Sequence, residues 1–379
     1  MKIFKQPFLM SLFFLIAAIF LTLETTHAST KGNLFPIATT AGSEIGMSGA
    51  FDGTNYLLGI QGDATANNHI TAQLISTTGA PVGSRISIMR TDAGRTATGG
   101  APNVAFDGTN YLVIWADDHY SDGNYHPDGY DVQFGQLINQ SGEQVSSSFF
   151  LGASLADAYS FYNSGAVIFD GNNYFVVWER RRLSENSDNA DIYGQFITPS
   201  GALLGPAIAI STAIHGQRDP ALAFDGTNIM VVWTDSRNHR ACYPDESGKC
   251  YESDIYGQLV AKSSMSSAGS LNGSNFLINA GSLPRDGSSP AIAFDGTNYF
   301  IAFAEETTFP DLAPGGVETW HVFGQRVNTS GTALGGTISI KTDGNIMFPG
   351  ISFDGTKYLV TWNDRTNWDF YGQLVNISG

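Results

Sequence analysis

The chain has few charges and very few cysteines. Charged residues make up 14% of its 379 positions, and 35 acidic residues outnumber 19 lysines and arginines, so the formal net charge is −16. A surface of this sign argues against nucleic acids and anionic membranes as partners. The sequence also carries no phosphate-binding loop, no nucleophile motif and no zinc-type set of histidines and cysteines. It therefore identifies no reaction directly.

Cys242 and Cys250 are the only two cysteines. In an exported protein such a pair is typical of a disulfide that closes a small loop. A metal site is the alternative, but two sulfur atoms without a second pair nearby make a weak one. We therefore expect a disulfide between Cys242 and Cys250.

Residues 1–28 have the pattern of a secretory signal peptide. Two lysines precede an apolar stretch from Phe8 to Leu23, and a small residue, Ala28, stands at the expected cleavage point. A membrane anchor is the alternative, but a spanning helix needs about 20 apolar residues and this stretch is shorter. We expect cleavage after Ala28, no membrane insertion of the mature chain, and an extracellular, periplasmic or cell-surface location.

Residues 29–379 are predicted to form a single domain built from six copies of one repeat. Each copy contains Phe-Asp-Gly, then a hydrophobic run such as YLVIW at 111–115, then a second motif, DIYGQ in its clearest form at 191–195. The six copies centre on Phe51, Phe106, Phe169, Phe224, Phe294 and Phe353. Matched copies of two motifs in a fixed order indicate a repeat architecture.

Each copy predicts four short strands, which we call A to D in chain order. Strand A ends at the phenylalanine, Asp-Gly forms the A–B turn, strand B is the apolar run, strand C carries the glutamine, and strand D follows a Ser-Gly turn. Strand B is apolar on both faces, as expected of a sheet that is covered on each side. The predicted fold is therefore all-β, a six-bladed β-propeller of four-stranded antiparallel blades.

The two ends of the chain complement each other. The last repeat stops just after strand C, whereas residues 31–40 look like a strand D placed before the first strand A. We expect this N-terminal strand to pair with the last repeat and close the ring, because closure removes exposed sheet edges. An open solenoid is the alternative, but it should have capping repeats.

Candidate functional residues lie where the B–C and D–A loops emerge, because these loops vary in length and binding sites usually lie in such loops. Two positions after the strand B aromatic, five repeats carry Asp117, Arg180, Asp235, Glu305 and Asp364. A B–C hairpin should bring Asp235 close to Asp254. The acids could bind Ca²⁺ or a sugar. Alternatively, they cap loops and pair with neighbouring arginines.

Two B–C loops break the repeat. The second repeat has DDHYSDGNYHPDGYD at 117–131, and the fourth has the cysteine loop with basic residues beside it. The candidate ligand-binding residues are therefore His119, His126, Arg180, Arg237 and His239. The spacing of the two histidines in the second repeat matches no specific metal site. The sequence establishes no cofactor and leaves open only Ca²⁺, which the loop-end carboxylates could bind.

Residues that recur in every blade are expected to be structural. The strand B tryptophans, such as Trp115 and Trp233, should pack between blades. The glutamines of the second motif should bond to backbone groups between blades. A functional site is then to be sought in the second and fourth repeats, where the sequence departs from the pattern.

The combination of FDGTNYLVVW-like and DIYGQLV-like segments, ending in Ser-Gly, resembles repeats of secreted bacterial surface and extracellular proteins over residues 33–379. The resemblance implies an exported bacterial propeller and brings no catalytic residues with it. Because six near-equivalent blades show no asymmetric catalytic set, we predict a monomeric binding or interaction protein that recognises a glycan or a protein surface. The alternative is a polysaccharide-acting hydrolase or lyase that uses Asp117, Asp235 and Asp364.

Overall fold

The computed structural model describes residues 46–62, 70–90, 95–96, 100, 102–117, 132–151, 159–160, 165–182, 190–238, 253–279, 287–308, 319–367 and 369–378. All of them belong to one compact unit, residues 37–379. In these ranges the chain forms strands and turns but no helix, and so contains no helical span long and apolar enough for a membrane.

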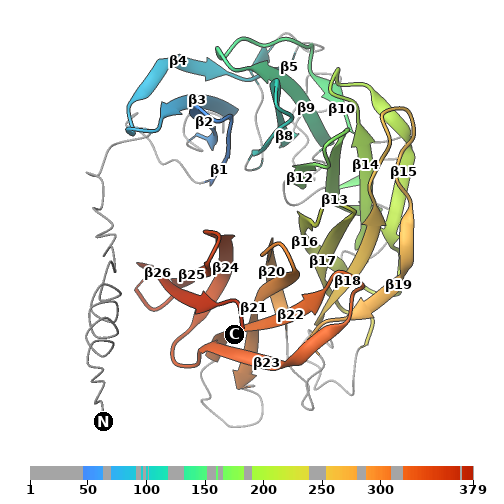
Figure 1. The fold of residues 1–379 in the computed structure, drawn as a ribbon, viewed down its shortest axis with the longest axis vertical. Coiled ribbons are helices and arrows are strands. Elements are labelled where there is room, and N and C mark those ends of the chain that lie inside the picture. The colour runs from blue at the N-terminus through green and yellow to red at the C-terminus, as the bar shows by residue number, and fades with distance from the viewer. Residues whose placement is uncertain are drawn as a thin grey trace, which may run out of the picture. The chain divides into compact units, whose positions relative to one another are not determined.

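Six antiparallel sheets follow one another along the chain as the blades of a β-propeller, as the sequence predicts (Figure 1). Blade 1 consists of β1 (Gly46–Phe51), β2 (Asn55–Gln61), β3 (Ile70–Ser76) and β4 (Pro81–Ser87). Blade 2 consists of β7 (Asn103–Phe106), β8 (Asn110–Asp117), β9 (Val132–Asn139) and β10 (Phe149–Phe150). Blade 3 consists of β12 (Ala166–Phe169), β13 (Tyr174–Arg182), β14 (Ala190–Ile197) and β15 (Leu203–Ser211).

The second half of the chain repeats the pattern. Blade 4 consists of β16 (Gln217–Phe224), β17 (Asn228–Asp235), β18 (Asp254–Ala261) and β19 (Leu271–Leu277). Blade 5 consists of β20 (Gly287–Phe294), β21 (Asn298–Thr308), β22 (Thr319–Asn328) and β23 (Ala333–Lys341). Blade 6 has three described strands, β24 (Ile346–Phe353), β25 (Lys357–Asp364) and β26 (Asp369–Asn376). Residues 31–40, the predicted fourth strand of blade 6, lie outside the described residues.

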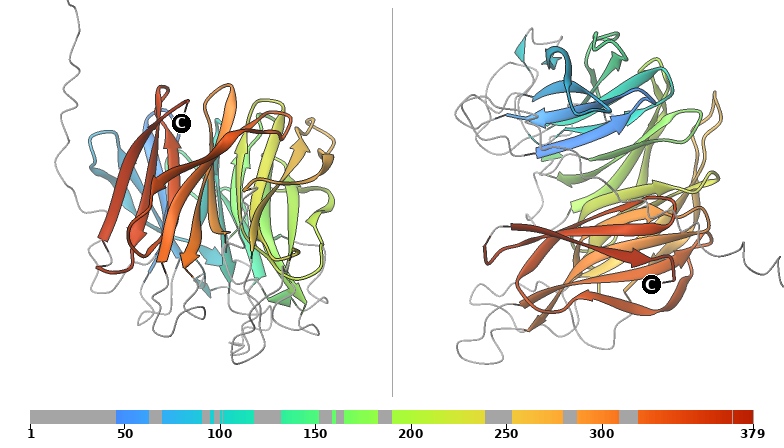
Figure 2. Two further views of the ribbon diagram at one scale, coloured as in Figure 1. Left: turned by 90° about the horizontal axis from the view of Figure 1, so that it is seen from below. Right: turned by 60° about the vertical axis from the view of Figure 1, so that its left-hand side comes forward.

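Three short strands stand beside the blades. β11 (Tyr159–Ser160) pairs with the end of β13, and β5 (Met89–Arg90) pairs with β6 (Arg95–Thr96). The first strands of successive blades also contact one another, from β1 through β7, β12, β16 and β20 to β24. Figure 2 shows the blades from the side, with their strand ends gathered at two opposite ends of the domain. We call the end with the A–B and C–D turns the turn end, and the end with the B–C and D–A connections the loop end.

The Phe-Asp-Gly motif forms the A–B turn in all six blades. In blade 2, for example, Asp107 Oδ1 accepts the amides of Thr109 and Asn110 at 2.7 and 2.6 Å. The glycine adopts a positive φ, 96° at Gly108, which a side chain would oppose. The motif is therefore a hairpin element, and its aspartate is occupied by backbone amides.

The strand B tryptophans pack in the core, as predicted. Trp115 and Trp233 are fully buried, and Trp178 and Trp362 are almost so. All eight residues of β17 are buried, because blades 3 and 5 cover blade 4 on both sides. Two-sided burial of this kind explains why strand B is apolar throughout.

In blades 1 to 5 the glutamines of the second motif bond within their own blade, so the expected bond between blades is wrong there. Gln195 lies where the β14–β15 register shifts, between Gly194 and Phe196. Its side-chain amide donates to the carbonyls of Phe196 at 2.9 Å and Leu204 at 3.1 Å. The shift frees carbonyl groups from the strand ladder, and the glutamine supplies the donor that they would otherwise lack.

A tyrosine at the start of strand B joins blades 2, 3 and 5 to the turn of the preceding blade. Tyr174 OH in blade 3 donates to the Asn110 carbonyl in blade 2 at 2.7 Å. Tyr111 and Tyr299 do the same with Asn55 and Asn228, at 3.3 and 3.1 Å. Burial, with the negative charge of Asp107 nearby, raises the pKa of Tyr174. The hydroxyl therefore stays protonated and able to donate.

Blade 4 lacks this tyrosine and uses a different contact. Ile229 stands at the position, and the Ser/Gly-rich insertion of the blade 4 C–D turn reaches the turn of blade 3 instead. Ser263 donates through its backbone N–H and its hydroxyl to Asp170 Oδ2, both at 2.7 Å. Asn173 Nδ2 in turn donates to Ser263 Oγ at 2.8 Å. The insertion thus replaces a contact that the repeat would normally provide.

Candidate functional site

The strand B acids of blades 2 and 4 are tied to their own tryptophans at the loop end. Asp235 and Asp117 are fully buried. Trp233 Nε1 donates to Asp235 Oδ2 at 2.6 Å, and Trp115 Nε1 donates to Asp117 Oδ2 at 3.4 Å. Because a buried indole N–H needs an acceptor, the acid two residues later holds the tryptophan in place.

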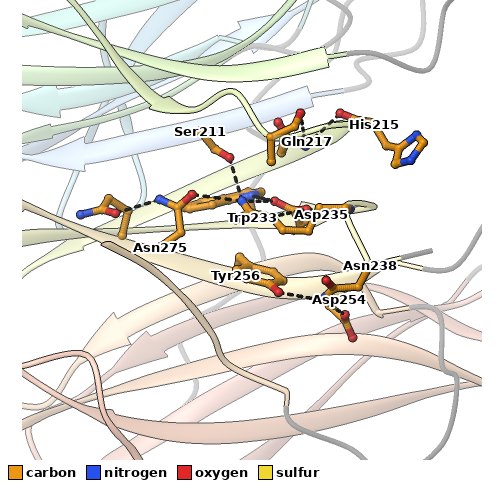
Figure 3. Close-up of polar contacts among 12 residues, drawn as sticks. Ser211, His215, Gln217, Trp233, Asp235, Asn238, Asp254, Tyr256 and Asn275 are labelled. Atoms are coloured by element: carbon orange, nitrogen blue, oxygen red, sulfur yellow. Dashed lines mark hydrogen bonds and ion pairs between the residues drawn. The ribbon is translucent and has the colours of Figure 1, made fainter. Parts of the chain in front are cut away.

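Arg237 is the centre of a polar network in blade 4, and Figure 3 labels its partners Ser211, Asp235 and Asn275. Its guanidinium donates to Asp235 Oδ1 through Nε at 2.8 Å and to Oδ2 through Nη2 at 2.6 Å. Nη2 also donates to Ser211 Oγ on β15 at 2.8 Å and to Asn275 Oδ1 on β19 at 3.1 Å. The guanidinium carbon lies 4.2 Å from the ring centroid of Tyr256, within range of a cation–π contact.

This network fixes Arg237, a predicted ligand-binding residue, within the protein. It joins the outer strand of blade 3 to three elements of blade 4, and the Arg237 side chain is only 19% exposed. Neighbouring Asn238 donates to Asp254 Oδ2 at 3.1 Å and to the Tyr256 hydroxyl at 2.6 Å. The arrangement stabilises the contact between blades 3 and 4 and orders the start of the B–C loop.

The acids at the loop end face each other across the B–C hairpins, as predicted for blade 4. Asp235 is the register partner of Asp254. The corresponding pairs in blades 3, 5 and 6 are Arg180 with Asp191, Glu305 with His321, and Asp364 with Asp369. This pair of positions therefore holds an arginine and an aspartate in blade 3 but two aspartates in blades 4 and 6. The side chains vary from blade to blade, whereas the strand pairing stays the same.

Blade 3 shows what changes when the acid is replaced. Arg180 stands at the position of Asp235, and its guanidinium carbon lies 4.6 Å from the centroid of the Tyr193 ring. The indole nitrogen of Trp178 is buried and has no hydrogen-bond partner in the described part of the chain. Arg180, the second predicted ligand-binding residue within the described ranges, is thus partly buried against its own sheet.

Asp364 differs from the other two acids of the predicted catalytic set. Its Oδ1 accepts the amide of Thr366 at 2.9 Å and so caps the turn that follows β25. The indole nitrogen of Trp362 is buried without a partner among the described residues, although Asp364 follows it by two positions. Asp117, Asp235 and Asp364 occupy equivalent positions of three different blades, each bonded to groups of its own hairpin.

A feature that the sequence analysis missed lies at the start of the innermost strands. Asp219, Ser289 and Phe348 are the third residues of β16, β20 and β24, and their φ angles are 52°, 50° and 53°. The strand register shifts at each of them. This left-handed conformation is unfavourable for residues other than glycine, and a following proline favours extended backbone instead.

The three residues lie at the loop end of neighbouring blades, on strands that contact one another around the middle of the ring. Phe348 is 60% exposed. The amide of Ser289 donates to Thr234 Oγ1 of blade 4 at 3.1 Å, which anchors the bulge to its neighbour. Strained backbone of this kind persists where the surrounding structure enforces it and often marks a functional position.

A sequence signal for these bulges exists. A proline stands four positions before the phenylalanine of the Phe-Asp-Gly motif in four repeats, namely at Pro102, Pro220, Pro290 and Pro349. Proline cannot donate to the strand ladder and is tolerated at a bulge or at the start of a strand. The D–A connection before β16 is also ordered, because the buried Gln217 side chain donates to the His215 carbonyl at 2.9 Å (Figure 3).

His119, His126, His239, Cys242 and Cys250 lie outside the described residues, so their roles in ligand binding and in a disulfide stay predictions. Among the residues that the structure describes, no three or more histidine, cysteine or acidic side chains form a group that could hold a metal ion.

Comparisons with known proteins yield similar folds only. No protein-family model matches the chain, and no curated protein matches its sequence. Among solved structures, the chain is similar to a Trypanosoma rangeli sialidase in complex with sialic acid, at a TM-score of 0.48 and 12% identity over 89% of this chain and 54% of that one. It is also similar to a polysaccharide lyase, at a TM-score of 0.44 and 10% identity over 92% of this chain and 84% of that one.

A third similar structure is an alpha-L-arabinofuranosidase from Lactobacillus brevis, with a TM-score of 0.44 and 12% identity over 78% of this chain and 94% of that one.

Proposed function

We propose that this protein is an exported propeller that binds a glycan at its loop end, near the start of β16, β20 and β24. The observation that carries the proposal is the exposed ring of Phe348, held in strained backbone at the position that Asp219 and Ser289 occupy on the contacting first strands of the two preceding blades. Export rests on the predicted signal peptide of residues 1–28.

The three side chains have complementary chemistry toward a sugar. A sugar ring has C–H faces that pack on an aromatic ring, and hydroxyl groups that need acceptors and donors. A carboxylate accepts such bonds, and a serine hydroxyl both donates and accepts them. An aromatic side chain that is 60% exposed costs free energy in water, and a ligand that covers it would recover part of that cost.

Hydrolysis or lysis by Asp117, Asp235 and Asp364 has less support. A general acid or nucleophile must reach the substrate within hydrogen-bond distance. Asp117 and Asp235 are fully buried, and each accepts a bond from the tryptophan of its own strand. Their geometry fits the role of holding strand B better than that of acting on a polymer at the surface.

The test is a glycan array followed by titration calorimetry of the best ligand with the full mature chain. Phe348→Ala should raise Kd by about tenfold, the equivalent of one aromatic contact. Phe348→Tyr should bind within about threefold of the original protein, because it keeps the ring. Met265→Ala is the matched control, since Met265 is 81% exposed but lies in the C–D turn of blade 4 at the turn end.

Two outcomes would overturn the proposal. One is an array without any bound glycan. The other is a ligand whose affinity is the same for Phe348→Ala and for the original protein. Turnover of a polysaccharide that is lost in Asp235→Asn or Asp364→Asn, with the fold retained, would instead support the hydrolase or lyase.

A further inference from the structure

Blade 6 exposes an apolar face that the other blades bury. Leu359, Phe370 and Leu374 are 41%, 80% and 57% exposed. Leu359 pairs with Leu374 and Phe370 with Asn363 across β25 and β26, so these side chains share one face of the sheet. The opposite face carries Tyr358, Val360 and Trp362, which are buried against blade 5.

The exposed face corresponds to a contact surface in the rest of the ring. In blade 5, Phe300 occupies the repeat position of Leu359, and it is fully buried. Tyr358 of blade 6 covers it, with 4.8 Å between the ring centroids. In blade 3, Phe175 and Val177 pack in the same way on Ile229 and Val231 of blade 4. The exposed face of blade 6 thus corresponds to the surface that, in blades 3 and 5, the next blade along the chain covers.

Blade 1 exposes the other half. Tyr56 stands at the position of Tyr111, Tyr174, Tyr299 and Tyr358, which are all buried, but it is itself 43% exposed. Phe51, whose ring centroid lies 4.6 Å from that of Tyr56, is 44% exposed. Elsewhere in the ring, the tyrosine hydroxyl donates to a carbonyl in the A–B turn of the preceding blade.

The receiving turn in blade 6 is already formed. Asp354 Oδ1 accepts the amides of Thr356 and Lys357, both at 2.7 Å, as the equivalent aspartate does in the other blades. These bonds, with the one from the Thr356 hydroxyl, lower the pKa of Asp354. Lys357 takes the place of the asparagine whose carbonyl accepts the tyrosine, and the amide of Asp354 closes the turn onto the Lys357 carbonyl at 3.0 Å.

We propose that blades 6 and 1 of one chain form a sixth blade–blade contact, in which Tyr56 OH donates to the carbonyl of Lys357 beside the Asp354 carboxylate. Leu359, Phe370 and Leu374 are then covered by Tyr56 and the residues of its face of β2. In the part of the chain that the structure describes, one half is exposed on blade 1 and the other on blade 6. Because one polypeptide carries both blades, blade 1 is present at blade 6 of the same chain at a far higher effective concentration than blade 1 of a second copy.

Hydroxyl-radical footprinting of the full mature chain tests this contact directly. Phe370 should be oxidised at least several-fold more slowly than Phe348, a matched phenylalanine that is 60% exposed at the loop end. Equal or faster oxidation of Phe370 would overturn the proposal. Light scattering on the same sample should give the mass of a monomer, and protection of Phe370 found only in a dimer would assign the face to a second copy instead.

A pair of matched variants tests the hydrogen bond. Tyr56→Phe should lower the Tm by about 1–3 °C, as Tyr111→Phe should, because each loses one buried inter-blade bond. Tyr111→Phe serves as the control, since its bond is present in the structure. A lower Tm for Tyr111→Phe with an unchanged Tm for Tyr56→Phe would show that the Tyr56 hydroxyl stays in water and would refute the proposed contact.

Discussion

Replacing Arg237 by methionine should destabilise the protein far more than the loss of a surface salt bridge does. Methionine keeps much of the apolar length of the side chain over Tyr256 but removes the charge. Asp235 would remain fully buried with only the Trp233 indole and one backbone amide as donors. Breaking a buried pair in this way costs about 3–5 kcal/mol, whereas exposed pairs contribute about 0–1 kcal/mol.

The partial exposure of the Arg237 side chain decides where in that range the loss of unfolding free energy should fall. Because the Arg237 side chain is 19% exposed, we expect the free energy of unfolding to fall by about 3 kcal/mol, the lower end of the range for a buried pair. Adding Asp235→Asn should restore part of this loss, because the asparagine removes the unpaired charge and can still accept from the indole. The coupling between the two changes should reach about 1–2 kcal/mol.

Urea unfolding followed by tryptophan fluorescence measures both quantities. Arg365→Met is the matched control, since Arg365 is exposed at the equivalent turn of blade 6, and it should change stability by less than about 0.5 kcal/mol. A loss below about 1 kcal/mol for Arg237→Met, or additive effects of the two changes, would refute the view that this network holds blades 3 and 4 together.

Three further predictions concern the scaffold. Above pH 10 the free energy of unfolding should fall with pH, because burial raises the pKa of Tyr174 above that of an unfolded tyrosine, and the decline should be shallower in Tyr174→Phe than in the original protein. Ser263→Ala should cost about 2 kcal/mol in urea unfolding, as it leaves Asp170 and Asn173 short of a buried partner, whereas the exposed Ser267→Ala should be neutral. Deleting residues 31–40 should sharply lower the Tm if they complete blade 6, and an unchanged melt would count against that pairing.

The fold could be predicted because its signals are local and repeated. Phe-Asp-Gly requires a positive φ at the glycine and supplies the aspartate that closes the turn, so six copies predict six hairpins without any tertiary information. The four strands per repeat followed from turn residues and from the two-sided apolar run of strand B. The burial of Trp233 followed from the same run.

The details that were missed depend on contacts between segments far apart in the sequence. The partners of Gln195 could not be predicted, because they depend on where the β14–β15 register shifts. Asp219, Ser289 and Phe348 share a backbone conformation but no side-chain property, so their own residue types gave no sign of the bulge, and the signal lay in the proline that follows each of them. Arg237 was predicted to bind a ligand, which stays a prediction, and its hydrogen-bond partners come from β15 and β19 as well as from its own hairpin.

The contact between Ser263 and Asp170 limits how freely the blades can be exchanged. A blade that carries the strand B tyrosine brings its own link to the preceding turn, so it could be copied or moved as a unit. Blade 4 carries Ile229, and its link lies in the C–D turn insertion. A design that swaps blade 4 for a consensus blade must therefore restore tyrosine at this position, and one that transplants blade 4 must carry residues 263–272 with it. At the interface of blades 3 and 4, strand β17 and the C–D turn insertion, about 35 residues further along the chain, must therefore be kept or exchanged together.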